Sequence, residues 1–216
     1  MKTSLLTLLL FMAGIQFTNA QQLFLKTGAT LSNFQYENSE GVSLDNLQSV
    51  GKFHFGIGNR YLMNHGSLFF TYGASWNNYG AIGSDPHLNN FFEWDLTYVG
   101  LRTGLDIKFL EAQDFSISFS GNIGAEYLIR GTQVINNQTF DIRGSDEYNS
   151  LYLMIWAGPL ASYELSRKSA ICFQYQFGYS LLNSQGSGND NEHLKLLAHQ
   201  FSIGFLINIT NVYCPF

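Results

Sequence analysis

Apolar and polar side chains alternate along most of the chain in short runs of the kind that form β-strands. In the clearest run, apolar residues occupy nearly every second position from Phe115 to Ile129, and mostly Ser, Asn, Gly and Glu lie between them. A period of two places the apolar side chains on one face of a strand and the polar ones on the other. Runs of this kind predict strands at residues 23–33, 52–62, 67–78, 92–109, 115–129, 150–165, 170–179 and 198–209.

The connections between these runs are alternately short and long. The links at 63–66, 110–114 and 166–169 are tight, and those at 34–51, 80–90, 131–147 and 181–196 are long and polar. An even number of strands with every long loop at one end is typical of bacterial outer-membrane β-barrels. The pattern therefore predicts an all-β fold, a closed antiparallel up-and-down membrane β-barrel of about eight strands.

Two of the predicted strands depart from simple alternation. In the run at 92–109 the apolar parity changes near Thr97, which predicts a β-bulge or an extension beyond the membrane. In the run at 150–165 both parities are apolar, and Pro159 removes a backbone donor that a closed sheet would use. The pattern at 150–165 therefore indicates a strand less clearly than the other runs do.

The first 20 residues have the pattern of a secretory signal peptide. Lys2 supplies a positive charge, an apolar stretch runs over residues 5–15, and residues 18–20 form a small-residue cleavage site. We therefore expect residues 1–20 to be a cleaved signal peptide and residues 21–216 to be one outer-membrane β-barrel domain. Charged residues make up only 12% of the chain and mean hydropathy is −0.03, as expected for strands with one lipid-facing and one polar side.

The distribution of bulky and small side chains indicates which face meets lipid. One face carries many Phe residues, and the other carries mostly Gly, Ser, Thr, Asn and Gln. Because a narrow barrel has little interior room, we expect the small polar residues inside and the Phe residues outside. The alternative is a soluble ligand-binding barrel with the Phe face inward. Most charged residues of the strands share the small-residue face, namely Lys26, Lys52, Arg60, Arg102, Asp106, Lys108, Glu126 and Arg130.

Charges enclosed in a lumen must pair with one another. Their positions along the strands predict two layers of internal salt bridges, with Asp106 and Glu126 as the acidic members. The layer near the tight turns would contain Lys26, Arg60, Asp106 and Lys108, and the layer near the long loops would contain Lys52, Glu126 and Arg130. We expect these layers to fill the barrel and fix the strand register rather than to form a transport pathway.

Aromatic residues near the strand ends predict interfacial girdles. Trp76, Tyr79, Trp94 and Tyr179 would mark the outer membrane interface, and Tyr61, Phe109, Phe115 and Tyr163 the inner one.

The sequence offers little catalytic or metal-binding chemistry. The histidines lack metal-ligand spacing, so we predict no metal, cofactor or catalytic residue. A lipid-modifying enzyme would require His87 or His199 to meet a Ser and an acid at the outer rim, and no Gly-x-Ser-x-Gly motif occurs. Cys172 and Cys214 lie near strand ends that share one rim, so they either form a disulfide or remain two thiols.

The long loops are the candidate binding surface. They are acidic, and the formal net charge of −5 argues against nucleic-acid binding. Their acidic residues are Glu37, Glu40, Asp45, Asp85, Asp141, Asp146, Glu147, Asp190 and Glu192. Such a rim could coordinate the divalent cations that bridge lipopolysaccharide, or could simply repel anions. The long outer loops could also bind a protein partner. We expect a non-enzymatic structural or surface-binding protein, or an accessory to a membrane complex. A small-solute channel or uptake protein is the first alternative and a lipid-modifying enzyme the second.

The first predicted strand, residues 23–33, resembles the opening of the outer-membrane β-barrel proteins common in Bacteroidetes, including the PorT-like proteins. That opening has the form apolar-x-Lys-x-Gly-x-x-x-Ser, and Lys26, Gly28 and Ser32 match it. The resemblance implies the same plan of a signal peptide, about eight strands and long outer loops. Many such barrels also end on an aromatic residue that assists assembly. Phe216 is aromatic here, but Pro215 precedes it, so the last paired strand is expected to stop near Ile209.

Overall fold

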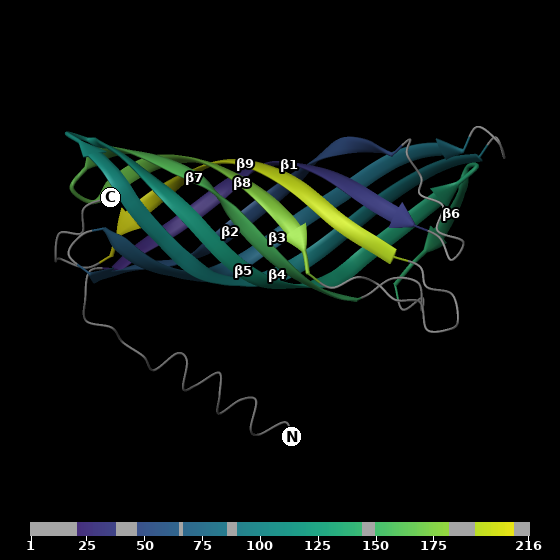
Figure 1. The fold of residues 1–216 in the computed structure, drawn as a ribbon, viewed down its shortest axis with the longest axis horizontal. Coiled ribbons are helices and arrows are strands. Elements are labelled where there is room, and N and C mark those ends of the chain that lie inside the picture. Colours follow the sequence, from purple (N-terminus) through teal and green to yellow (C-terminus); the bar gives the residue numbers. More distant parts are fainter. Residues whose placement is uncertain are drawn as a thin grey trace, which may run out of the picture.

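The computed structural model describes residues 21–37, 47–64, 67–85, 90–143, 150–181 and 193–209. These residues form nine antiparallel strands (Figure 1). The strands are β1 (Gln21–Glu37), β2 (Gln48–Asn64), β3 (Leu68–Asp85), β4 (Asn90–Ala112), β5 (Phe115–Ile135), β6 (Gln138–Asp141), β7 (Leu151–Ser166), β8 (Ser169–Ser180) and β9 (His193–Asn208). None of the described residues belongs to a helix that is long and apolar enough to cross a membrane. The signal peptide expected at 1–20 lies outside the described residues.

Eight of the strands close into a ring, as the sequence predicts. Each pairs with its neighbours in chain order, β5 with β7, and β9 pairs with β1 to complete the barrel. Following paired residues once around the ring from Gln22 leads back to β1 at Ser32, ten positions further along. This displacement corresponds to a strand tilt of about 40°, and it leaves an interior just wide enough for side chains.

The bulky apolar side chains point away from the barrel. Phe53, Phe119 and Phe173 are each more than half exposed, and they belong to a belt that includes residues of all eight ring strands. The small-residue face points inward, where the buried Ser116, Ser118 and Ser120 alternate with more exposed residues of β5. The alternative of a soluble barrel with the Phe face inward is therefore wrong.

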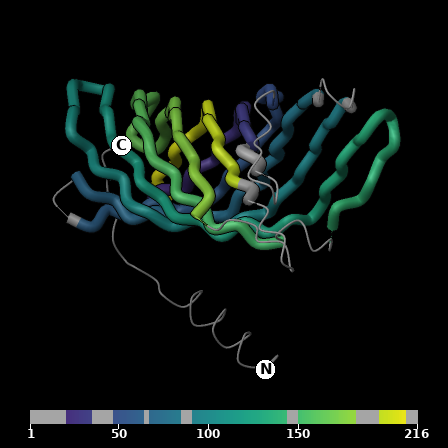
Figure 2. Tube along the Cα trace, turned by 45° about the vertical axis from the view of Figure 1, so that its right-hand side comes forward, coloured from purple at the N-terminus to yellow at the C-terminus, as the bar shows by residue number. Residues whose placement is uncertain are grey.

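Most of the strands extend beyond the ends predicted for them near the long loops, whereas β7 and β8 end within one residue of the prediction. Most of the loop expected at 80–90 is paired strand, because β3 continues to Asp85 and β4 begins at Asn90. The loop expected at 131–147 holds the end of β5 and the whole of β6, which form a hairpin. Its two-residue turn, Asn136-Asn137, has φ angles of 49° and 69°, the left-handed geometry that tight hairpins favour. The hairpin projects from the barrel end (Figure 2).

The two predicted irregularities have different outcomes. The β4–β5 ladder shifts register between Thr97 and Tyr98, but the extra residue lies in β5. β4 itself keeps its alternation, since Trp94, Leu96, Tyr98 and Gly100 are all buried, so its change of apolar parity does not come from a bulge in this strand. Pro159 lies in a gap of the β7–β8 ladder, whose pairs on either side are Ala157–Phe177 and Leu160–Gln174. The missing proline donor therefore falls where this ladder is already open.

We predict that an arginine in the middle of the lipid-facing belt destabilises the barrel far more than one at its edge. Ile203 and Ile209 are 44% and 55% exposed, and about 15 Å separates them along the barrel axis, given about 3.3 Å of rise per residue and the tilt above. Ile203→Arg should cost about 2–4 kcal/mol and Ile209→Arg at most about 1 kcal/mol. Urea unfolding in lipid vesicles measures both, and equal costs would contradict the assigned membrane face.

Candidate functional site in the barrel lumen

An ion pair occupies the lumen near the tight-turn end. Arg60 on β2 donates from Nε to Asp106 on β4 at 3.0 Å, and both side chains are 2% exposed. Arg60 also donates to Gln22 at 2.8 Å, and its guanidinium lies 3.5 Å from the ring centroid of Phe69. Ser120 donates to the second carboxylate oxygen of Asp106. The buried charges are therefore both neutralised and hydrogen-bonded, as a low-dielectric interior requires.

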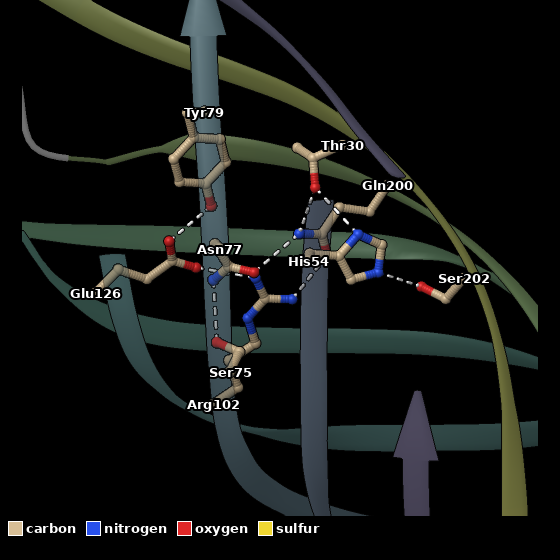
Figure 3. A network of polar contacts seen from close by, with 9 residues as sticks. All are labelled: Thr30, His54, Ser75, Asn77, Tyr79, Arg102, Glu126, Gln200 and Ser202. Atoms are coloured by element: carbon tan, nitrogen blue, oxygen red, sulfur yellow. Dashed lines mark hydrogen bonds and ion pairs between the residues drawn. The ribbon is translucent and has the colours of Figure 1, made fainter. Parts of the chain in front are cut away.

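A second ion pair lies nearer the long-loop end (Figure 3). Arg102 on β4 donates to Glu126 on β5 at 2.9 Å and to Gln200 on β9 at 3.0 Å. The hydroxyl of Tyr79 donates to the other carboxylate oxygen of Glu126 at 2.6 Å. The guanidinium of Arg102 stacks 4.1 Å above the ring of Trp156, a favourable cation–π geometry. This group joins five strands across the lumen.

His54 extends the polar network beside this second pair. Its two ring nitrogens contact the hydroxyls of Thr30 at 3.1 Å and Ser202 at 2.8 Å. Gly28 on β1 pairs with His54 on β2 and with Ser202 on β9. Because Gly28 has no side chain, His54 and Ser202 can contact each other across β1. A Cβ at Gly28 would lie 1.9 Å from the backbone oxygen of Phe201. The glycine therefore lets β2 and β9 interact across β1.

The two layers differ in membership from the sequence prediction. Arg60 and Asp106 meet as expected, but Glu126 pairs with Arg102 rather than with Lys52 or Arg130. Lys52 instead lies 3.3 Å from Asp95, and both side chains are partly exposed.

The remaining three predicted lumen charges have separate surroundings. Lys26 donates to Gln174 at 2.9 Å, and Lys108 lies 2.9 Å from Glu111 at the tight-turn rim. Arg130 is exposed, so its predicted place in the lumen is wrong. It lies opposite Thr97 after the β5 bulge, where one extra residue reverses the alternation of faces.

Above the second ion pair, the lumen is filled by large apolar side chains rather than by small polar ones. Their cluster contains Phe34, Tyr79, Ala81, Trp94, Leu96, Tyr98, Leu128, Ile142, Tyr152, Met154, Trp156, Leu196 and Ala198. Hereafter we call this cluster the aromatic plug. Tyr98 makes edge contacts with Tyr79 and Tyr152 at centroid distances of 5.7 and 5.6 Å. The plug explains why the strand at 150–165 is apolar on both faces.

The plug corrects part of the predicted aromatic girdles. Tyr79 and Trp94 are buried inside the barrel and therefore are not outer girdle residues. Tyr61 keeps its predicted place on the outer face, where it stacks on the exposed Tyr72 and is largely covered by it. The other predicted girdle residues are exposed, namely Trp76, Phe109, Phe115, Tyr163 and Tyr179.

A small cavity of about 60 Å³ lies between the two ion pairs. Asp106 and Ser120 line its inner part, and Arg102, Gln200 and His54 line its outer part. A volume of this size admits a few water molecules, and the aromatic plug covers it on the long-loop side. In its described part, the lumen is therefore packed with side chains rather than open from end to end.

The structure gives little support to the other candidate chemistry. His199 is exposed on the outer face, where its Nδ1 lies 2.8 Å from the hydroxyl of Tyr175. Its cross-strand neighbours are Leu31 and Phe177, not a Ser and an acid. His87 lies outside the described residues. Within the described ranges no three His, Cys, Asp or Glu side chains could hold a metal ion.

The disulfide between Cys172 and Cys214 stays a prediction, because Cys214 lies outside the described residues. Cys172 is buried in the lumen and packs with Leu160, Ala170 and Leu206.

The outer rim is described mainly at the β5–β6 hairpin. Arg143 donates to Asp141 through its backbone and its guanidinium. These hydrogen bonds lower the pKa of Asp141 to about 2, so its carboxylate stays ionised at any physiological pH. Glu40, Asp45, Asp146, Glu147, Asp190 and Glu192 lie outside the described residues, as do the side chains of Glu37 and Asp85.

Several residues of the lumen network were not singled out from the sequence. Gln200, Ser202 and Thr30 appear in the sequence as ordinary polar positions of alternating strands. Tyr79 and Trp156 appear as surface aromatics or as part of an apolar run. In the sequence, these residues occupy the same alternate strand positions as the charged residues that face the lumen. This alternation identifies them as lumen residues only when the positions of the bulges are known.

Comparison with known proteins gives matches among solved structures alone. No family model matches the chain, and no curated protein matches it. Neisserial surface protein A superposes with a TM-score of 0.50 at 12% identity, over 87% of this chain and 97% of that one. A major outer membrane protein from Thermus thermophilus superposes with a TM-score of 0.55 at 10% identity, over 88% and 100%. The attachment invasion locus protein Ail of Yersinia pestis gives 0.46 at 12% identity, over 88% and 99%.

These similarities and the closed ring define the class of the fold. The chain has the fold of a bacterial outer-membrane β-barrel with eight strands in its ring. Identities of 10–12% relate the folds and not the activities.

We predict that breaking the inner ion pair costs more than removing it entirely. Asp106→Leu leaves the Arg60 charge buried and should cost about 3–5 kcal/mol. The double variant Arg60→Met/Asp106→Leu removes both charges and should recover most of that loss. Urea unfolding of the two variants and of Arg60→Met completes the cycle. Additive losses would show that the charges do not interact.

We also predict opposite outcomes for two glycines of the same barrel. Gly28→Ala forces a Cβ against the backbone of β9 and should cost about 1–3 kcal/mol, as overpacking typically does. Gly121→Ala is the matched control, because a Cβ there has no atom within 4 Å. It should be neutral or slightly stabilising in the same unfolding measurement. Similar losses of unfolding free energy at both sites would mean that replacing a glycine in a strand is itself destabilising, and that the close contact at Gly28 is not the cause.

Proposed function

We propose that this chain is a non-enzymatic protein of the bacterial outer membrane that acts at the cell surface, as a structural or binding component or as an accessory to a membrane complex. The observation that carries the proposal is the filled lumen. Two ion pairs, Arg60–Asp106 and Arg102–Glu126, cross it, and the aromatic plug lies on their long-loop side. With the interior committed to packing, the outer surface and loops are what remain for function.

The lipid-facing belt supports an outer-membrane location. Exposed Phe, Ile, Leu and Val side chains surround the barrel, and charged side chains of its middle section point into the lumen. The solved structures that match are outer-membrane barrels of bacteria. Lipopolysaccharide at the outer leaflet and a protein partner at the loops are the contacts we propose, with the β5–β6 hairpin as the described part of that surface.

A small-solute channel is the second candidate. The part of the lumen on the tight-turn side of the aromatic plug favours a channel, because polar side chains line it and it contains the cavity of about 60 Å³. Transport through this path would require both ion pairs and the aromatic plug to move aside. An enzyme is the third candidate, and it would depend on His87, since His199 faces outward beside Tyr175.

The first strand supports kinship with the Bacteroidetes barrels that include the PorT-like proteins. Lys26, Gly28 and Ser32 all face the lumen: Lys26 contacts Gln174, Gly28 underlies the His54–Ser202 contact, and Ser32 bonds to the backbone of Gly80. The spacing Lys-x-Gly-x-x-x-Ser thus has a structural reason. A solved PorT-like barrel should place its own Lys, Gly and Ser on the lumen face of the first strand, and an outward placement would end this kinship argument.

Planar-bilayer recording tests the filled lumen directly. The protein should fractionate with the outer membrane, migrate faster on gels unboiled than boiled, and then give no steady single-channel steps. A porin inserted into the same bilayers is the positive control. Steps of constant conductance that recur with each insertion would favour the channel, and recovery in the soluble fraction would remove the membrane assignment altogether.

A further inference from the structure

The lumen contains one cation whose charge is not matched by a carboxylate of the described residues. Arg60, Arg102, Lys108 and Lys52 each form an ion pair. No carboxylate in the described ranges forms one with Lys26. Its ammonium contacts the neutral amide oxygen of Gln174 at 2.9 Å and lies 4.7 Å from the ring centroid of Phe24. A charge held inside a barrel without a counter-charge is strongly unfavourable.

The surroundings of Lys26 leave room for a counter-ion. Lys26 pairs with Gly56 on β2 and with Gly204 on β9, so neither neighbour covers it with a side chain. The residue is partly exposed although its side chain faces the lumen. It lines the cavity of about 60 Å³ that lies between the two ion pairs.

The cavity contains donors besides the ammonium. Arg102, Asn122 and Ser202 line it, and the guanidinium of Arg102 supplies a second positive group at its outer part. Asp106 is the acidic group of the lining, and Arg60 and Ser120 already bind its two oxygens. One water molecule needs on the order of 10–15 Å³ of such space, so a monatomic anion and water fit together.

We propose that this cavity binds a small inorganic anion of the halide class, with Lys26 as its principal ligand. The anion supplies the negative charge that the described lumen lacks, and it is held inside the barrel as a structural counter-ion. An anion bound in a filled lumen gives no current in bilayer recordings, whereas an anion that moves through an open lumen does. Anion binding can therefore be tested separately from channel activity.

Thermal unfolding in detergent tests the site with chloride as the probe. The purified protein should show a saturable rise in Tm when sodium gluconate is replaced by sodium chloride at constant ionic strength. Gluconate is the control anion, because its six-carbon chain exceeds the cavity. Lys26→Met should abolish the rise. Lys52→Met is the matched control, since its ammonium pairs with Asp95 outside the cavity lining, and this variant should keep the rise.

Crystals soaked in bromide give the direct readout. An anomalous peak in hydrogen-bonding distance of the Lys26 ammonium is the expected result. Three outcomes would overturn the proposal: equal Tm values in chloride and gluconate, which would leave water alone in the cavity; a chloride response retained by Lys26→Met; or a bromide peak only elsewhere. If Lys26→Met does not fold, wild-type bromide crystals and the chloride titration still decide the matter.

Discussion

Closure of the sheet into a ring fixes the strand tilt, the width of the lumen and the height at which each inward side chain lies. Inside a membrane no water is available for backbone groups, so the strands must pair around a complete ring. The ring closes here with a displacement of ten residues, through the pairing of β9 with β1. That displacement fixes the strand tilt and the narrow lumen. It also decides which side chains from distant strands lie at one height, and therefore which charges can pair.

The lumen is organised by this geometry into zones of different chemistry. Near the tight turns lies the Arg60–Asp106 pair, next comes the cavity, then the Arg102–Glu126 pair, and finally the aromatic plug. Each charged pair has further hydrogen-bond partners, Gln22 and Ser120 in one case and Tyr79 and Gln200 in the other. Such partners make buried charges tolerable and make a single register preferable to its alternatives.

The alternation of side chains was sufficient to predict the strands of the ring, the closed barrel and the lipid-facing side. It was insufficient where one residue changes parity. The bulge near Leu128 turns Arg130 outward, and no local feature of the sequence marks its position. The pairing of Glu126 with Arg102 was missed for another reason. The register of β4 and β5 follows from their turn and from the irregularity near Lys108, and it places Arg102 opposite Gly124, diagonal to Glu126. Tyr79 and Trp94 were misplaced because an aromatic residue near a strand end suits either a girdle or an interior plug.

The contact of His54 with Ser202 over Gly28 bears on the order in which the barrel assembles. The two residues are separated by 148 positions, and the strand between them is β1, which closes the ring against β9. Thr71 and Asn122 meet over Gly104 in the same way, but within three consecutive strands. The second contact can form early in a growing meander, whereas the first exists only after the ends of the chain have met. At Gly28 the closure of the barrel thus connects three strands, β2, β1 and β9, and the contact between His54 and Ser202 must break before the ring can open.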